Sequence, residues 1–201
     1  MPKSRPYDLV IFDFDDTILH LDVSWKAVKA DVVTLAKSNG IKADPKEHLV
    51  PMSNRLSRGS GLKKGIDAIY LRFESECAKS HAFRTFPEMS ALIKDLRKEG
   101  YYLAVASGNH SKTIRDILGQ AGLLEEFDIV CGRDSVENNK PAPDQVQLIL
   151  RHLDMGKGQA VFIGDSINDE GAAKAAGVRY IRAKPGEDGK AAELLRKALL
   201  G

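Results

Sequence analysis

Two aspartates that follow a short apolar segment are the strongest chemical signal in this sequence. Residues 8–12 (DLVIF) run directly into residues 13–17 (DFDDT). Asp13 and Asp15 are two positions apart, so their side chains emerge on the same side of an extended chain. One carboxylate can attack a phosphorus atom while the other transfers a proton. The two acids repel each other, which calls for a cation, and the Thr17 hydroxyl can orient the nucleophile.

Two further groups could bind the oxygens of a phosphoryl group. Ser107, Gly108 and Asn109 follow the apolar segment 101–106 (YYLAVA). A hydroxyl beside a glycine lets backbone N–H groups approach phosphate oxygens. Lys140 lies in NNKPAPD, just ahead of a predicted helix. A fixed ammonium group there would offset negative charge on the nucleophile and on the phosphoryl group.

A second pair of acids completes the set. Asp165 and Asp169 lie in GDSIND, at the end of the apolar segment 160–164 (AVFIG). Their carboxylates can complete a site of hard oxygen ligands, which suits Mg²⁺. All four groups lie at or just beyond the C-terminal ends of predicted strands, and in an open parallel sheet those ends converge on one crevice. The sequence therefore predicts a single site built from all four groups.

The elements that must position these groups alternate along the chain. Apolar segments typical of buried parallel strands occur at 8–12, 101–106, 127–130, 160–164 and 178–181. Helical patterns fall between them, with starts predicted at Pro87 and Pro143 and a third helix ending at Gly177. Strands that alternate with helices predict an α/β fold, a Rossmann-like parallel sheet with helices on both faces.

Residues 18–85 interrupt this alternation with helical signals and no convincing strand. A plain crossover between parallel strands needs only one helix. We therefore expect an α-helical cap domain at 18–85, inserted into a catalytic core formed by 1–17 and 86–201.

Three helices are expected in this insert. Ser24 is predicted to cap the first, which buries Trp25. The second is predicted to begin at Asp44–Pro45 and to be interrupted at Pro51. The third has its apolar face between Ile66 and Cys77.

The basic, glycine-rich segment 54–65 is expected to be a loop of the insert. It is either a solvated loop or a loop that meets the anionic end of a substrate. In the second case, the substrate contacts would come from Arg55, Arg58 and Lys63.

In this order, DFDDTI, VASGN, KPAPD and GDSIND resemble the four motifs of the haloacid dehalogenase superfamily of phosphohydrolases. The helical insert resembles the helical-cap subclass, which includes phosphoglycolate phosphatase and β-phosphoglucomutase. The resemblance implies that Asp13 is the nucleophile and forms an aspartyl-phosphate. It implies that Asp15 protonates the leaving group and then activates water, and that Mg²⁺ is held by the Asp13 carboxylate, the Asp15 backbone carbonyl and Asp165.

The same resemblance assigns the remaining motif residues. It implies that Ser107 and Lys140 bind phosphoryl oxygens and that Asp169 supports Lys140 or a metal-bound water. Position 16 is an aspartate here, where glycine is the commoner residue of the family. The dehalogenases lack an acid at the position of Asp15, so its presence favours phosphoryl transfer over carbon–halogen cleavage.

The expected function is the magnesium-dependent hydrolysis of a small phosphomonoester, similar to the reaction of phosphoglycolate phosphatases. A phosphomutase of the β-phosphoglucomutase kind, which returns the phosphoryl group to a sugar, remains open. A signalling receiver domain would also use an acidic pair, a metal, a hydroxyl and a lysine. It is disfavoured because no aspartate ends the segment 101–106 and because receivers lack a helical insert.

Composition excludes or weakens several other classes. The formal net charge is only +2, which gives no support to a nucleic-acid-binding role, and no apolar run approaches the length of a membrane span. Cys77 and Cys131 show no metal-type spacing, so we expect buried thiols rather than a disulfide. The cytoplasm is the default expectation for the compartment. The expected partner is a small phosphorylated metabolite, and the expected state is a monomer or homodimer.

Overall fold

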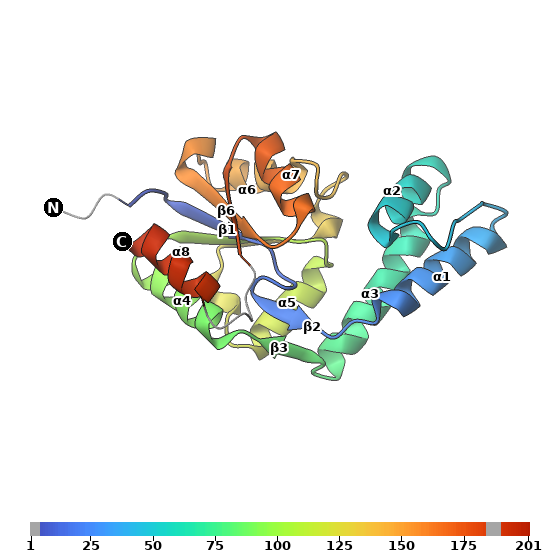
Figure 1. Ribbon diagram of the computed structural model, residues 1–201, viewed down its shortest axis with the longest axis horizontal. Coiled ribbons are helices and arrows are strands. Elements are labelled where there is room, and N and C mark those ends of the chain that lie inside the picture. The colour runs from blue at the N-terminus through green and yellow to red at the C-terminus, as the bar shows by residue number, and fades with distance from the viewer. Residues whose placement is uncertain (1–4, 184–189) are drawn as a thin grey trace. The chain divides into compact units, whose positions relative to one another are not determined.

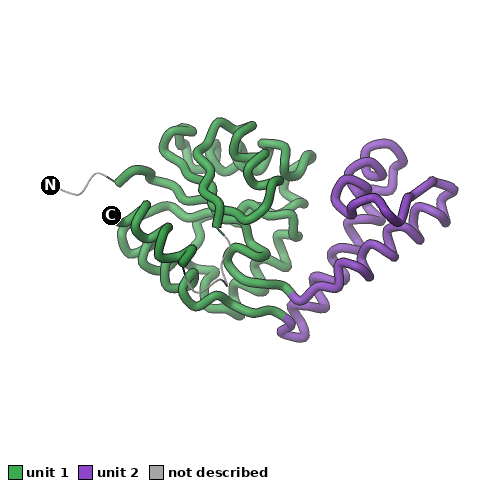
Figure 2. The backbone as a smooth tube through the Cα atoms, viewed as in Figure 1, with its two compact units in different colours: residues 1–21, 83–201 green, residues 22–82 purple. Residues whose placement is uncertain are grey.

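The computed structural model describes residues 5–183 and 190–201. Its contacts divide the chain into two compact units, residues 1–21 with 83–201 and residues 22–82 (Figure 2). The larger unit contains β1 (Leu9–Phe12), β2 (Leu19–Leu21), β3 (Phe83–Thr85), α4 (Pro87–Lys98), β4 (Tyr102–Ala106), α5 (Ser111–Gln120), β5 (Ile129–Cys131), α6 (Asp144–His152), β6 (Ala160–Gly164), α7 (Ile167–Ala176), β7 (Arg179–Arg182) and α8 (Lys190–Leu200). It also has three short 3₁₀ helices, η1 (Leu124–Glu126), η2 (Arg133–Ser135) and η3 (Lys157–Gln159).

Five parallel strands form the central sheet, in the order β5-β4-β1-β6-β7. Helices α6 and α7 lie on one side of this sheet, and α4 and α8 lie on the other (Figure 1). β1 is the middle strand and is fully buried, because helices cover both of its faces. Leu9 and Ile11 pack in the cluster that includes residues of α6 and α7, and Val10 and Phe12 point to the opposite face. The predicted α/β fold is confirmed.

The helices begin and end where the sequence supplies the right residues. Pro87 occupies the first turn of α4, where its missing N–H costs nothing. Ser166 caps α7 and accepts a hydrogen bond from Asp169 N. The helix ends at Gly177, whose φ of 74° is easily reached only by glycine. These ends place residues 165–169 at the C-terminal edge of β6.

A short two-stranded sheet corrects the prediction that residues 18–85 contain no strand. β2 and β3 pair antiparallel, with Leu19 opposite Thr85 and Leu21 opposite Phe83. Each strand has only three residues. Alternation of polar and apolar residues needs more positions than that to be visible in a sequence. The two strands belong to the larger unit.

The smaller unit consists of α1 (Trp25–Ser38), α2 (Leu49–Gly59) and α3 (Lys63–Lys79). Its core comes from all three helices and includes Val28, Val32, Met52, Leu56 and Ile66. The three helices agree with the helical insert that the sequence predicted, and its role as a cap, with domain boundaries at 17/18 and 85/86, stays a prediction.

Two details of the insert were predicted wrongly. The second helix begins at Leu49 rather than at Asp44–Pro45, and Pro51 does not interrupt it. Pro51 lies in the first turn, where a backbone N–H has no partner within the helix anyway. Trp25 is 37% exposed rather than buried, because it stands at the first position of α1.

Candidate active site

The Lys140 ammonium group lies between two carboxylates from distant parts of the chain. Its Nζ donates to Asp13 Oδ1 at 2.6 Å and also donates to Asp169 Oδ1. Asp169 is fully buried, and Asp13 and Lys140 are at most 9% exposed. Burial alone would lower the pKa of Lys140, but the two carboxylates outweigh burial and raise that pKa. The lysine is therefore held in its charged form against both acids.

The other oxygen of Asp169 belongs to the cap of α7. Asp169 Oδ2 accepts hydrogen bonds from Ser166 N at 2.9 Å and from Ser166 Oγ. A Cβ atom added to Gly164 would lie 2.7 Å from Asp169 Cγ, so only glycine lets this carboxylate lie against the end of β6. Asp169 thus fixes the helix start with one oxygen and Lys140 with the other. The functional role that the resemblance implied for Asp169, support of Lys140 or of a metal-bound water, stays a prediction.

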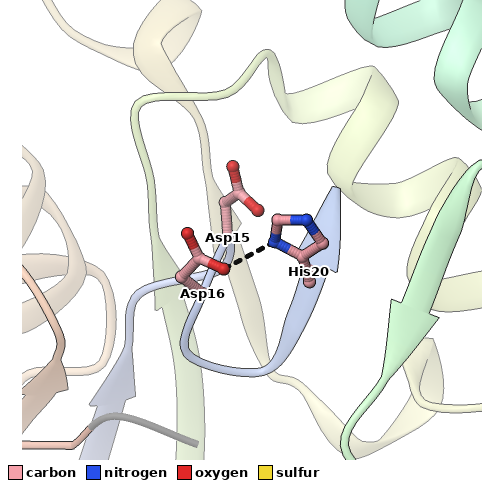
Figure 3. Close-up of side chains that lie close together, drawn as sticks. All are labelled: Asp15, Asp16 and His20. Carbon is pink, nitrogen blue, oxygen red and sulfur yellow. Dashed lines mark hydrogen bonds and ion pairs between the residues drawn. The ribbon is translucent and has the colours of Figure 1, made fainter. Parts of the chain in front are cut away.

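Asp15 lies in the turn that joins β1 to β2, and its neighbours hold that turn in place (Figure 3). Asp15 Oδ1 accepts a hydrogen bond from Leu21 N at 2.8 Å. Asp16 has a left-handed backbone with φ of 57°, and its Oδ1 lies 2.6 Å from His20 Nδ1. Burial, with a smaller contribution from the charges of Asp16 and Asp13, raises the pKa of Asp15 to about 7. At that pKa, Asp15 can both donate and accept a proton near neutral pH.

Three carboxylates at the end of the sheet fit a divalent metal ion. Asp13, Asp165 and Asp169 each place an oxygen within 4.8 Å of the others. Burial and the charge of Asp169 raise the pKa of Asp165 to about 6, and burial raises that of Asp13 to about 7 against the opposing effect of Lys140. Three carboxylates this close together are a suitable set of hard oxygen ligands for Mg²⁺, whose charge would relieve their repulsion.

The predicted phosphate-binding loop lies at the end of β4, the neighbour of β1. Phe12 is paired with Val105 in the sheet, so Asp13 and Ser107 leave adjacent strands at nearly the same level. Ser107 Oγ donates to Asn109 Oδ1 at 3.0 Å and accepts from Asn109 N at 3.2 Å. Both residues are buried, whereas Gly108 between them is exposed. The loop is thus anchored at both ends and open at its glycine.

Thr17 is fully buried near the start of β2. Its Oγ1 has no hydrogen-bond partner among residues 5–183 and 190–201. A buried hydroxyl without a partner is costly, so its presence favours a polar role at this site. That Thr17 orients the nucleophile stays a prediction.

The three basic residues predicted to meet the substrate lie in the smaller unit. The loop expected at 54–65 is instead the end of α2, a link of three residues and the start of α3. Arg55 forms a two-pronged ion pair with Glu47, with Nη2 2.6 Å from Oε2. Arg58 and Lys63 are exposed, at the end of α2 and the start of α3 respectively. Their contact with a substrate stays a prediction.

Residues 10–183 match the family model described as haloacid dehalogenase-like hydrolase. The chain belongs to this family. The match includes β1 from Val10 onward, the four sequence motifs and every residue of the site described above. Among residues 5–183 and 190–201, none of the helices combines the length and apolar character that a membrane span requires. Cys77 and Cys131 are both buried thiols outside any disulfide, as expected.

Members of the family that are similar to this chain include phosphoglycolate phosphatases. The one from Shigella boydii serotype 4 is 28% identical over 162 residues, which cover 81% of this chain and 60% of that protein. The one from Escherichia coli strain K12 is 31% identical over 109 residues, which cover 54% of this chain and 43% of that protein. The chain therefore spans three fifths or less of the length of these relatives.

Solved structures support the fold. A haloacid dehalogenase-superfamily hydrolase of subfamily IA from Geobacter sulfurreducens aligns with a TM-score of 0.60 and 23% identity, covering 90% of this chain and 91% of that one. CbbY from Rhodobacter sphaeroides, solved in complex with phosphate, aligns with a TM-score of 0.63 and 23% identity, covering 90% and 87%. At these identities the comparison shows the shared fold alone.

Sequence reasoning missed two side chains that support the site. His20, which pairs with Asp16, appeared only as a histidine without ligand spacing. Tyr180 on β7 donates through its hydroxyl to the carbonyl oxygens of Gly164, at 2.9 Å, and Ser166, at 3.3 Å, which flank Asp165. Tyr180 could not be recognised in the sequence, because its hydroxyl binds backbone oxygens 14 and 16 positions earlier in the chain. His20 contacts Asp16 only four positions earlier, but a single histidine carries no ligand spacing that would mark it.

Proposed function

We propose that this protein is a magnesium-dependent phosphatase that hydrolyses a small phosphomonoester through an aspartyl-phosphate on Asp13. The observation that carries the proposal is the buried Lys140, held charged between Asp13 and Asp169. An ammonium group in this place keeps the Asp13 carboxylate oriented and offers positive charge beside it. Asp15, with a raised pKa, stands two residues away as an acid and base.

In the first half of the reaction, an oxygen of Asp13 attacks phosphorus and the bond from phosphorus to the leaving oxygen breaks. Protonated Asp15 gives its proton to that leaving oxygen, which departs as an alcohol. In the second half, the Asp15 carboxylate takes a proton from water as the water oxygen attacks the phosphorus of the aspartyl-phosphate. The bond to Asp13 breaks, inorganic phosphate forms, and both acids return to their starting states.

Asp13 and Asp165 would hold Mg²⁺, with the Asp15 backbone carbonyl as the third protein ligand, and Asp169 stands beside them. The ion supplies positive charge that stabilises the transferring phosphoryl oxygens. Ser107 and the backbone of Gly108 would bind the same oxygens from the side of β4. Lys140 would neutralise charge from the side of α6.

The similarity to phosphoglycolate phosphatases supports the proposed substrate class. The alignment with a phosphoglycolate phosphatase covers 81% of this chain at 28% identity. Small organic phosphates such as phosphoglycolate are therefore the substrates to test first. Within the helical insert, Arg58 and Lys63 are the basic residues proposed to meet an anionic substrate. Arg55 already forms a two-pronged ion pair with Glu47 and is less suited than Arg58.

The decisive experiment measures phosphate release from a panel of small phosphomonoesters, with Mg²⁺ and with EDTA. We expect metal-dependent turnover, and a loss of at least about 10³-fold for both Asp13→Asn and Asp15→Asn. Mass spectrometry of Asp15→Asn after exposure to substrate should show a phosphorylated protein, because the nucleophile remains. Full activity of Asp13→Asn would refute the mechanism. Transfer of the phosphoryl group to a sugar hydroxyl in place of water would identify a phosphomutase instead.

The role of the insert has its own matched pair of variants. Arg58→Gln should raise KM for the best anionic substrate, and Arg55→Gln should change it less. Equal KM values for both variants and the wild type would exclude these arginines from substrate binding.

A further inference from the structure

Three consecutive backbone carbonyls in the loop 107–109 accept hydrogen bonds from outside the loop. Gln145 Nε2, in the first turn of α6, donates to Ser107 O at 2.7 Å. Arg133, in η2, donates through Nη1 to Gly108 O at 3.2 Å and through its backbone N to Asn109 O at 2.9 Å. The carbonyl side of the loop is therefore held by two residues of the scaffold.

This anchoring decides where the N–H groups of the loop point. In a trans peptide the C=O and the following N–H point in opposite directions. With Ser107 O turned to Gln145, the N–H of Gly108 points away from the protein scaffold. Within the part of the chain that the structure describes, no acceptor lies within hydrogen-bond distance of Gly108 N. Gly108 is exposed, and a Cβ atom added to it would meet nothing within 4 Å, so the loop is open at its glycine.

The burial of Gln145 is energetically unfavourable. It is completely buried and lies beside Val146 and Ile149 of the hydrophobic cluster. Its Nε2 has two carbonyl acceptors, since it also lies 3.4 Å from Cys131 O, but its Oε1 has no partner among the described residues. A buried amide oxygen without a partner costs free energy that a leucine or methionine would avoid. The residue therefore destabilises the core slightly while it fixes the end of β4.

We propose that Gln145 is a positioning residue for phosphate binding, which holds Ser107 O so that the Gly108 N–H faces the phosphoryl group. Arg133 completes the arrangement by holding the next two carbonyls. This inference rests on the proposed phosphatase function and adds the residue that sets the geometry of its phosphate loop. The side chain itself does not touch the substrate.

The test replaces Gln145 by methionine, which keeps the length of the side chain and removes the donor. Inorganic phosphate is the probe, as a competitive inhibitor in the presence of Mg²⁺. We expect the phosphate inhibition constant and KM to rise about tenfold, with kcat changed by less than about threefold. Val146→Ala is the matched control, because Val146 is equally buried on the same helix but packs in the hydrophobic cluster and has no hydrogen-bonding side chain. It should lower the melting temperature and leave the inhibition constant unchanged.

Each outcome discriminates. A wild-type protein that neither hydrolyses phosphomonoesters nor binds phosphate would refute the proposed function and this inference together. A wild-type protein that does both, beside a Gln145→Met variant with an unchanged inhibition constant, would overturn the positioning role alone.

If Gln145→Met is recovered unfolded, Gln145→Glu gives the answer. A protonated glutamic acid can still donate to Ser107 O, and a glutamate cannot. The ratio of variant to wild-type phosphate inhibition constants should therefore rise between pH 5.5 and pH 8.5. A ratio that does not change with pH would contradict the proposal.

Discussion

Replacing Lys140 by methionine tests the central ion pairs of the site through stability alone. The substitution keeps the length of the side chain and removes the ammonium group that bonds Asp13 and Asp169. Removing one partner of a buried ion pair costs about 3–5 kcal/mol, because the remaining charge is left without compensation. Here two carboxylates lose the same partner.

Two features of the structure reduce that cost. Asp169 keeps its hydrogen bonds from the backbone N–H and hydroxyl of Ser166. Asp13 already has a pKa raised to about 7, so it can take up a proton once Lys140 is gone. We therefore expect a loss of about 3 kcal/mol in the free energy of unfolding at pH 8. At pH 5.5 protonation of Asp13 should reduce the loss to about half of that.

The assay is urea unfolding followed by circular dichroism, in EDTA, at both pH values. Lys112→Met is the matched control, because Lys112 makes a 2.7 Å ion pair with Asp116 while its side chain is 69% exposed. That pair should contribute less than about 0.5 kcal/mol. A loss for Lys140→Met below about 1 kcal/mol at pH 8, or an equal loss at both pH values, would show that the ammonium does not compensate buried charge as described.

Two more predictions concern the acids of the site. Asp13, Asp15 and Asp165 bind protons more tightly when the protein is folded, so between pH 4 and pH 7 the folded state holds more protons than the unfolded state. In EDTA, stability should therefore fall as pH rises through this window, and excess Mg²⁺ should make the decline smaller. The measurement is the urea midpoint at four pH values. A midpoint that stays constant or rises with pH would contradict the reasoning. Asp16→Gly should remove the strain of the left-handed backbone and so stabilise the protein by about 0.5–1 kcal/mol. It also loses the exposed contact with His20, which contributes a similar stabilisation or less. Its melting temperature should stay within about 4 °C of the wild type, and a larger drop would assign His20 a greater structural role than its exposure suggests.

The core of the fold and the positions of the motif residues could be predicted because buried strands have a recognisable hydrophobic pattern in the sequence. β1 and β6 are buried on both faces, so they read as continuous apolar runs, and the polar residues that follow them stand out. The acidic, hydroxyl and lysine groups then converge through topology alone.

Other features of the structure have no recognisable pattern in the sequence. The start of α2 is predicted too early because Asp44–Pro45 resembles a helix start. The interruption predicted at Pro51 is wrong because a proline in the first turn does no harm. β2 and β3 were missed because three residues cannot show a period. In the sequence, Gln145 resembles an ordinary helix residue, because its proposed positioning role depends on a hydrogen bond to Ser107, 38 positions earlier in the chain. Residues that act through tertiary hydrogen bonds need coordinates to be found.

The central place of β1 also has a consequence for how the protein folds. Its two neighbours, β4 and β6, lie far along the chain, and the bond between Lys140 and Asp13 spans 127 positions. The contacts within residues 22–82 are local by comparison. Closing a long loop loses conformational entropy before the distant contacts have formed. Local helices therefore form early, and such distant pairings form late. Asp13 directly follows β1, yet its surroundings are complete only after β6 has joined the sheet.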